Sequence, residues 1–255
     1  MKPIYVSVVG SRLYGIATQD SDHDIKGIGF NDVDEYIGLK SKEQQDYSNG
    51  KENNESFNGT IYDVRRVFHL LLKGNPTVLE PFCSDSNFII HTCDIGNQIA
   101  KFVRENLISK HFFAPFKGYH FSQIKEFTNS NRTGKRKESF EKYGYDGKFA
   151  GHAYRLSKQC INLMIDGWLN PTVDGQTKEI VMNMRNHIYS KEKCVKYLQD
   201  SDIEMDIAFS KSKLPDKPNF DMVNDFVTNI IYNYINGVYK DQIIEFDINS
   251  FKPLG

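Results

Sequence analysis

The 255-residue sequence predicts an α/β (α+β) chain, with a mixed β-sheet in its N-terminal part and helices in its C-terminal part. Two observations carry this prediction. Residues 4–9 are β-branched and aromatic apart from a serine, and residues 24–30 show the alternation of a strand. From residue 94 onward, apolar residues recur mostly at helical spacing. We therefore expect a core at 1–92 and a helical domain at 93–255.

The segment 57–72 predicts a third strand that leads directly into an amphipathic helix. Residues 57–63 read as the strand, and the helix covers 64–72. Its apolar residues recur at i, i+3, i+4, i+7 and i+8: Val64, Val67, Phe68, Leu71 and Leu72. Gly74 and Pro76 then end the helix. The polar stretch at 40–56 predicts a mobile surface loop.

The remaining elements are mostly long helices. We expect them at 148–168, 191–209 and 219–239, where apolar residues again form stripes. Residues 129–145 are polar and predict a loop. Its basic run at 132–137 is a candidate contact for nucleic acid, beside the plainer interpretation of a soluble loop.

Composition narrows the class of protein. The chain has 32 Lys and Arg against 33 Asp and Glu, which gives a net charge of −1. This balance excludes a polybasic tail as the main indication of a nucleic-acid partner. No apolar run approaches the 20 or so residues that a membrane span needs, and the N-terminus lacks a signal-peptide pattern. The four cysteines have no CxxC spacing. We therefore expect reduced thiols, no membrane partner and a cytoplasmic location.

The segment that follows the first strand carries the chemistry. Gly10 and Ser11 stand where the strand passes into a short helical turn, a junction that presents backbone N–H groups to a phosphate. Asp22 and Asp24 follow, spaced so that two carboxylates share one face of a strand. Paired carboxylates hold hard divalent cations, which in turn neutralise a triphosphate. Gly10-Ser11 alone is more simply a turn, and Asp22 with Asp24 alone is more simply a solvated loop. The two pairs in this order after a strand favour a site that binds a metal ion and a triphosphate.

The same residues carry a family resemblance. Gly10-Ser11, Gly15 and Ser-Asp-His-Asp at 21–24 resemble the signature of the DNA polymerase β-like nucleotidyltransferase superfamily. The chain looks most like the YcgL-type minimal nucleotidyltransferases of bacteria and phages. Three later segments match the family in order: Lys73–Glu80, Gly144–Leu156 and Ser212–Pro215. The resemblance therefore covers most of the chain.

The resemblance implies a nucleotidyltransferase core that transfers a nucleoside monophosphate from a nucleoside triphosphate, such as ATP, to a hydroxyl acceptor. Gly10 and Ser11 match the phosphate-binding pair. Asp22 and Asp24 match catalytic carboxylates that bind Mg²⁺ or Mn²⁺. The acceptor is a nucleic-acid end (RNA or DNA), a protein or a small molecule. Minimal nucleotidyltransferases often work beside another chain, so a partner chain and the oligomeric state stay open.

The sequence differs from the superfamily pattern at the third carboxylate. Counting back from the helix at 64–72 places it at position 58, which is Asn58. An asparagine has no charge and cannot accept a proton from the attacking hydroxyl. Asp63 is our candidate catalytic replacement, although it also fits a helix N-cap, and Glu55 is the other option. The alternative function is accordingly a catalytically impaired nucleotide- or nucleic-acid-binding module of the same fold.

A second group of candidates lies in the helix at 148–168. Lys148, His152 and Arg155 form one polar stripe, which favours phosphate binding or else a plain solvated face. We include all three as nucleotide-binding residues, together with Arg12. Glu80 is expected to be a buried acid that orients basic side chains, without a catalytic role.

Overall fold

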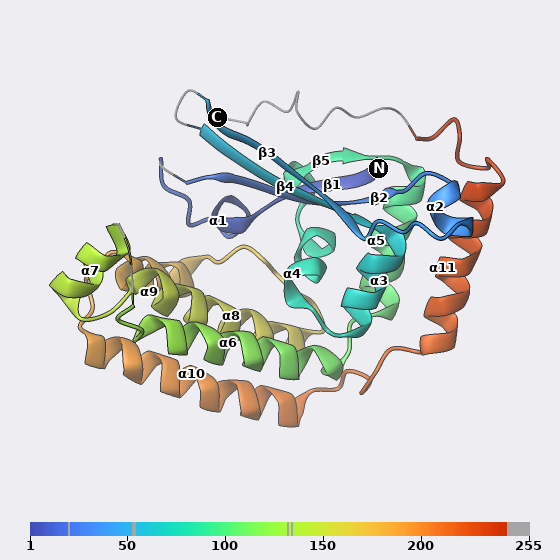
Figure 1. Ribbon diagram of the computed structural model, residues 1–255. Coiled ribbons are helices and arrows are strands. Elements are labelled where there is room, and N and C mark those ends of the chain that lie inside the picture. Colours follow the sequence, from blue (N-terminus) through green and yellow to red (C-terminus); the bar gives the residue numbers. More distant parts are fainter. Residues whose placement is uncertain (20, 53–54, 132, 134, 244–255) are drawn as a thin grey trace. The chain divides into compact units, whose positions relative to one another are not determined.

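The structure is a computed structural model that describes residues 1–19, 21–52, 55–131, 133 and 135–243 (Figure 1). It divides into two compact units, each described by itself. Unit 1 is Met1–Ile108 together with Lys217–Gly255, and unit 2 is Ser109–Asp216. The expected boundary at residues 92 and 93 does not coincide with this division.

Unit 1 is built on a mixed sheet, as the sequence predicts. Among its described residues, five strands follow the order β3–β4–β2–β1–β5. Their bounds are β1 Lys2–Val9, β2 His23–Phe30, β3 Gln44–Glu52, β4 Glu55–Asp63 and β5 Ile89–Thr92. β2 and β4 are parallel, and the other neighbouring pairs are antiparallel.

Strand β3 lies within the stretch that the sequence predicts as a surface loop, so that expectation is wrong. β3 pairs with β4 from Gln44 opposite Tyr62 to Glu52 opposite Glu55. Backbone hydrogen bonds provide this pairing and do not depend on apolar side chains. β3 stands at the edge of the sheet, where polar and charged residues also discourage pairing with another chain.

The helices of unit 1 lie below the strands and at the right-hand end of the sheet in Figure 1. They are α1 Gly10–Leu13, α2 Asp34–Ile37, α3 Val64–Leu72, α4 Pro76–Leu79, α5 Asp94–Asn106 and α11 Phe220–Ile235, with 3₁₀ turns at Glu80–Cys83 and Ser86–Phe88. Helix α3 buries the predicted stripe, apart from the half-buried Leu72.

Two helices expected in the C-terminal domain belong to unit 1, which corrects the domain boundary. Helix α5 packs on β1 so tightly that a Cβ at Gly96 would lie 2.0 Å from the carbonyl oxygen of Ile4. Helix α11 contributes Tyr234, whose ring stacks on Phe30 at 4.1 Å between centroids. Packing against the sheet, rather than position along the chain, therefore decides which unit these helices join.

Unit 2 is helical. Its elements are a 3₁₀ turn at Lys110–Phe112 and helices α6 Phe113–Phe127, α7 Lys135–Tyr143, α8 Gly147–Asp166, α9 Gly175–Arg185 and α10 Lys191–Lys211. Helix α8 packs against α6, α9 and α10. The helices expected at 148–168 and 191–209 are confirmed. The loop expected at 129–145 is wrong over α7, and Arg132 in its basic run lies outside the described residues.

None of the helices described has the length and apolar character needed to cross a membrane.

Candidate functional site

Gly10 joins strand β1 to helix α1 and lies directly against Asp24. Its φ of +70° is in the left-handed region that favours glycine. A Cβ at this position would stand 2.4 Å from Oδ2 of Asp24, closer than atoms can approach. Asp24 is opposite Val9 in the β1–β2 register, so neighbouring strands bring the two residues together. The sequence-predicted glycine and one predicted carboxylate are therefore in contact.

The loop between α1 and β2 positions the second carboxylate. The hydroxyl of Ser21 accepts the backbone N–H of Thr18 at 2.8 Å, and the carbonyl of Ser21 accepts Nη2 of Arg12 at 3.3 Å. These bonds hold the loop immediately before Asp22, which is exposed. The structure thus gives Arg12 a bracing contact within the loop.

Asp22 directly precedes β2, outside the strand on which the sequence analysis expects it, and the half-buried Asp24 is the second residue of β2. Their oxygen donors suit Mg²⁺, which proteins often hold through one or two carboxylates while waters and phosphates complete the coordination. Gly10 brings backbone against Asp24 because it has no side chain to clash with that carboxylate. The residues present therefore fit a divalent cation that a nucleotide helps to hold.

Asn58 occupies the position beside Asp24 on the next strand. The parallel register pairs Asp24 with Asn58, and Asn58 is exposed. Among the residues that the structure describes, no group of three or more His, Cys, Asp or Glu side chains is arranged to hold a metal ion. The side chain of Glu55, the other candidate acid, lies outside the described part of the chain.

Asp63 is not brought to the two aspartates. It pairs with Gly29, five residues along β2 from Asp24, a separation of roughly 16 Å at the rise of a strand. Its side chain is 2% exposed and caps α3 by accepting the N–H of Arg65 at 3.0 Å. Tyr36 also donates to it, at 2.5 Å. The helix N-cap interpretation of Asp63 is therefore confirmed, and this placement does not suit a third catalytic carboxylate.

A half-buried lysine that the sequence analysis missed lies on the same face of β2 as Asp24. Lys26 follows Asp24 by two residues, so both side chains point to one face. Its Nζ donates to the carbonyl of Thr77 at 3.1 Å. Burial lowers the pKa of Lys26, while the nearby carboxylates of Glu80 and Asp24 oppose that shift. The sequence could have indicated this placement of Lys26 only through the alternation of side chains along β2, which puts residues 24 and 26 on one face.

Glu80 is 1% exposed, and Oε2 accepts the hydroxyl of Tyr14 at 2.8 Å. Tyr14 directly follows α1, the helix that begins at Gly10. Glu80 therefore bonds to the residue that follows the candidate phosphate-binding segment, and its charge also acts on the half-buried Lys26. Its burial agrees with the expectation from the sequence.

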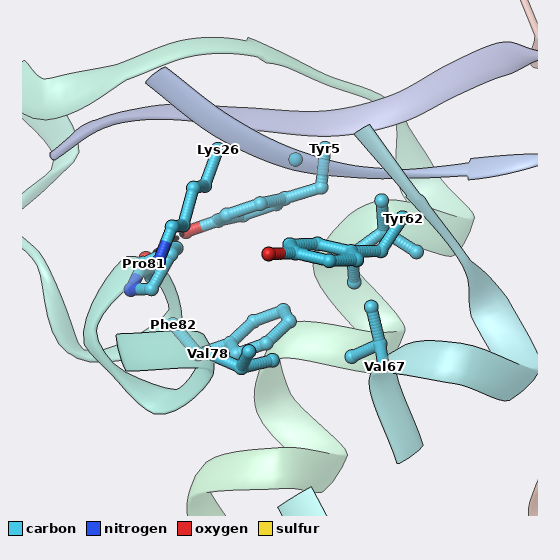
Figure 2. A pocket seen from close by; sticks show the side chains of 9 residues that line it. Tyr5, Lys26, Tyr62, Val67, Val78, Pro81 and Phe82 are labelled. Atoms are coloured by element: carbon cyan, nitrogen blue, oxygen red, sulfur yellow. Dashed lines mark hydrogen bonds between the residues drawn. The ribbon is translucent and has the colours of Figure 1, made fainter. Parts of the chain in front are cut away.

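A small cavity adjoins Lys26 in unit 1 (Figure 2). The rings of Tyr5, Tyr62 and Phe82 surround it, and Lys26 stands at its edge. The space amounts to about 230 Å³, part of it open to solvent. The hydroxyl of Tyr5 donates to the carbonyl of Pro81 at 2.9 Å. With this mainly aromatic and aliphatic lining, the cavity does not suit a phosphate.

The second group of candidates lies on α8 in unit 2. Lys148 is exposed, His152 is half-buried and Arg155 is 2% exposed. Burial, reinforced by the positive charges of Arg155, Lys148 and Arg185, lowers the pKa of His152 to about 3. The imidazole is therefore neutral near pH 7. Arg185, at the end of α9, is a further cation that the sequence did not single out.

Comparison with known proteins gives a family match that covers most of the chain. The sequence profile of a family described as "RNA repair pathway DNA polymerase beta family" matches residues 1–227. A search of curated proteins gives no match. Among solved structures, the crystal structure of a nucleotidyltransferase-like protein from Exiguobacterium sibiricum matches at 9% identity. That match covers 97% of this chain and 77% of the other, with a TM-score of 0.30.

Proposed function

The chain belongs to the RNA repair pathway DNA polymerase beta family, and is thus a member of the DNA polymerase β-like nucleotidyltransferase superfamily. We propose that it transfers a nucleoside monophosphate from a nucleoside triphosphate to a hydroxyl group. The observation that supports the proposal is the contact of Gly10 with Asp24, because the backbone turn that we propose to bind phosphate lies against the carboxylate that we propose to bind metal.

Each site residue has a distinct part in this reaction. Gly10 lets the triphosphate approach the backbone at the start of α1, and the hydroxyl of Ser11 adds a donor to a phosphate oxygen. Asp22 and Asp24 would hold Mg²⁺ or Mn²⁺, which when bound neutralises the triphosphate and lowers the pKa of the attacking hydroxyl. Arg12 supports the loop that carries Asp22.

The transfer is an in-line displacement at the α-phosphorus. The acceptor oxygen forms a bond to the α-phosphorus while the bond to the bridging oxygen of the β-phosphate breaks, and pyrophosphate leaves. Asn58 beside Asp24 cannot take the proton of the acceptor hydroxyl. In the proposed reaction that proton passes to solvent, which reaches the exposed Asp22 side of the site.

We propose an RNA hydroxyl as the acceptor, on the support of the family's RNA repair description. A nucleotide and a nucleic-acid end are both polyanions, whereas the net charge of the chain is −1. Contacts to them must therefore be local. The Lys148, His152 and Arg155 stripe of unit 2 is our candidate for phosphate contacts.

The test supplies each of the four nucleoside triphosphates with a label on the α-phosphate, together with Mg²⁺ and an oligoribonucleotide bearing a free 3′-hydroxyl. We expect label in the RNA with the wild type and at least a 100-fold lower rate with Asp24→Asn. Glu43→Gln, which removes an exposed acid elsewhere in unit 1, serves as the matched control and should retain the wild-type rate. Absence of transfer to RNA, or equal transfer by Asp24→Asn, would overturn the proposal.

The second candidate is a nucleotide- or nucleic-acid-binding module without catalysis, and Asn58 beside Asp24 is the observation that favours it. This candidate predicts tight binding of a nucleoside triphosphate that persists when divalent ions are removed with EDTA. Transfer of label by the wild type excludes it.

A further inference from the structure

Four nitrogen-bearing side chains meet in unit 2 where α8 and α9 are close together. Lys148, His152 and Arg155 follow one another at i, i+4 and i+7, which places them on one side of α8. Arg185 is the last residue of α9. The charges of Lys148, Arg155 and Arg185 all lower the pKa of His152, so the three cations lie near its ring.

Two glycines of α8 explain why Arg185 comes so close. A Cβ at Gly147 would lie 2.3 Å from the carbonyl oxygen of Met184, and a Cβ at Gly151 would lie 2.9 Å from Cγ of Arg185. A side chain at either position would push α9 away from α8. The two glycines therefore allow the stem of Arg185 to lie against the helix that carries Lys148 and Arg155.

The interior member of the group is held in a fixed position. Nη1 of the buried Arg155 donates to Oε1 of Gln159 at 2.6 Å, and Nε2 of Gln159 donates to the carbonyl of Pro171 at 2.9 Å. Arg185 is half-buried and Lys148 is exposed, so these two form the accessible side of the group. Because guanidinium groups suit phosphate oxygens, the arrangement is organised in advance for an anion.

We propose that Arg185, together with Lys148 and Arg155, forms a phosphate-binding site of unit 2 for a multiply charged phosphate group. Three cations on two adjoining helices attract two or more negative charges more strongly than the single charge of a phosphodiester. The group is then the triphosphate of a nucleotide or the terminal monophosphate of an RNA end. The proposal rests on the proposed function for its biological substrate, but not for the binding itself.

The first experiment uses the full chain and tripolyphosphate in EDTA, so that neither catalysis nor a metal site contributes. We expect calorimetry to give at least a tenfold weaker Kd for Arg185→Gln and an intermediate Kd for Arg185→Lys. Lys178→Gln, an exposed lysine of the same helix α9, is the matched control and should change the Kd less than twofold. Absence of binding by the wild type, or equal weakening by Arg185→Gln and Lys178→Gln, would overturn the site.

The second experiment distinguishes the two sources of phosphate. We measure wild type and Arg185→Gln with ATP, with a 5′-phosphorylated oligoribonucleotide and with the same oligoribonucleotide ending in a 5′-hydroxyl. A tenfold loss confined to ATP identifies the triphosphate, and a loss confined to the phosphorylated RNA identifies the terminal phosphate. A similar loss for the 5′-hydroxyl RNA would mean that the cluster binds diesters, which contradicts the proposal.

Asp24→Asn separates this inference from the proposed function. That variant should bind tripolyphosphate like the wild type even where it transfers no nucleotide. If the wild type transfers no nucleotide but Arg185→Gln still loses tripolyphosphate binding, the proposed function fails and the phosphate site stands. If Asp24→Asn and Arg185→Gln lose tripolyphosphate binding alike, the site is not confined to unit 2 and the inference fails.

Discussion

Gly10 lies so close to Asp24 that a Cβ at position 10 would stand 2.4 Å from Oδ2 of the carboxylate. We predict that Gly10→Ala moves that carboxylate and adds the cost of a left-handed backbone. A displacement of about 1 Å at a reacting centre costs roughly 100-fold in rate, so kcat/KM should fall by at least that factor. The strain should lower the free energy of unfolding by about 1–2 kcal/mol.

The matched control for Gly10→Ala is Gly237→Ala. Gly237 has a φ of +75° and no atom within 4 Å of its Cβ position, so it shares the strain without the contact. It should lose similar stability, by urea unfolding, and keep the wild-type kcat/KM within about twofold. Equal losses of activity in the two variants would show that the Asp24 contact does not matter.

Asp63 should matter for stability rather than for chemistry. Asp63→Ala removes the N-cap of α3 and the acceptor of the half-buried Tyr36 hydroxyl, and leaves the buried Asn31 amide only the carbonyl of Lys42. Loss of a cap costs about 1 kcal/mol, and each stranded buried donor costs about 1–3 kcal/mol. We expect the free energy of unfolding to fall by roughly 3 kcal/mol in urea titrations, while the rate of transfer per folded molecule is retained.

Asp94→Ala is the control for that substitution, because Asp94 is an exposed acid in the first turn of α5 and accepts no capping bond. Its free energy of unfolding should change by less than about 0.5 kcal/mol. If Asp63→Ala folds as stably as the wild type but loses transfer, Asp63 acts as the third catalytic carboxylate after all. That result would contradict the prediction.

Position 58 offers a gain-of-function test. Asn58→Asp places a carboxylate next to Asp24, at the position where the family resemblance leads us to expect the third acid. An added charge about 5 Å from a cation contributes about 1 kcal/mol in a solvated site, so half-saturating Mg²⁺ should fall roughly fivefold. Mg²⁺ titrations of transfer provide the measurement. Asn58→Ser, which stays neutral, should behave as the wild type, and an identical Mg²⁺ dependence of Asn58→Asp would contradict the placement.

We predict that His152 makes the free energy of unfolding fall in acid. Its folded pKa of about 3 lies below the ordinary value of 6.5, chiefly because of burial. Below pH 6.5 the unfolded chain binds a proton at His152 that the folded chain does not. The free energy of unfolding should therefore fall as the pH drops from 6.5 toward 3, by at most about 1.4 kcal/mol per pH unit.

Urea unfolding between pH 7 and pH 4.5 measures this slope. His152→Gln should have a shallower pH dependence than the wild type, since glutamine does not titrate. The exposed His69 is the control, and His69→Gln should keep the wild-type slope. If His152→Gln has the same pH dependence of the free energy of unfolding as the wild type, groups other than His152 cause the acid sensitivity.

Much of unit 1 was predictable because its signals are local. The β-branched run of β1, the apolar stripe of α3 and the offset of Asn58 from that helix can all be counted along the chain. The turn at Gly10 and the alternation that aligns Asp24 are local in the same way. These parts of the site follow from residue order alone.

The features that were missed depend on contacts between distant segments. Strand β3 has polar residues and owes its structure to pairing with β4. Helix α11 joins unit 1 because Tyr234 stacks on Phe30, some 200 residues earlier. Arg185 joins the α8 cations because Gly151 lacks a side chain. No periodicity within one segment encodes such contacts, which is why the sequence did not reveal them.

The most direct test of the central claim compares pyrophosphate release with label transfer in one reaction. Attack at the α-phosphorus predicts one pyrophosphate for each nucleoside monophosphate transferred to RNA, with both products reduced at least 100-fold in Asp24→Asn. Release of inorganic phosphate in place of pyrophosphate, or undiminished release by Asp24→Asn, would contradict nucleotidyl transfer at Asp22 and Asp24.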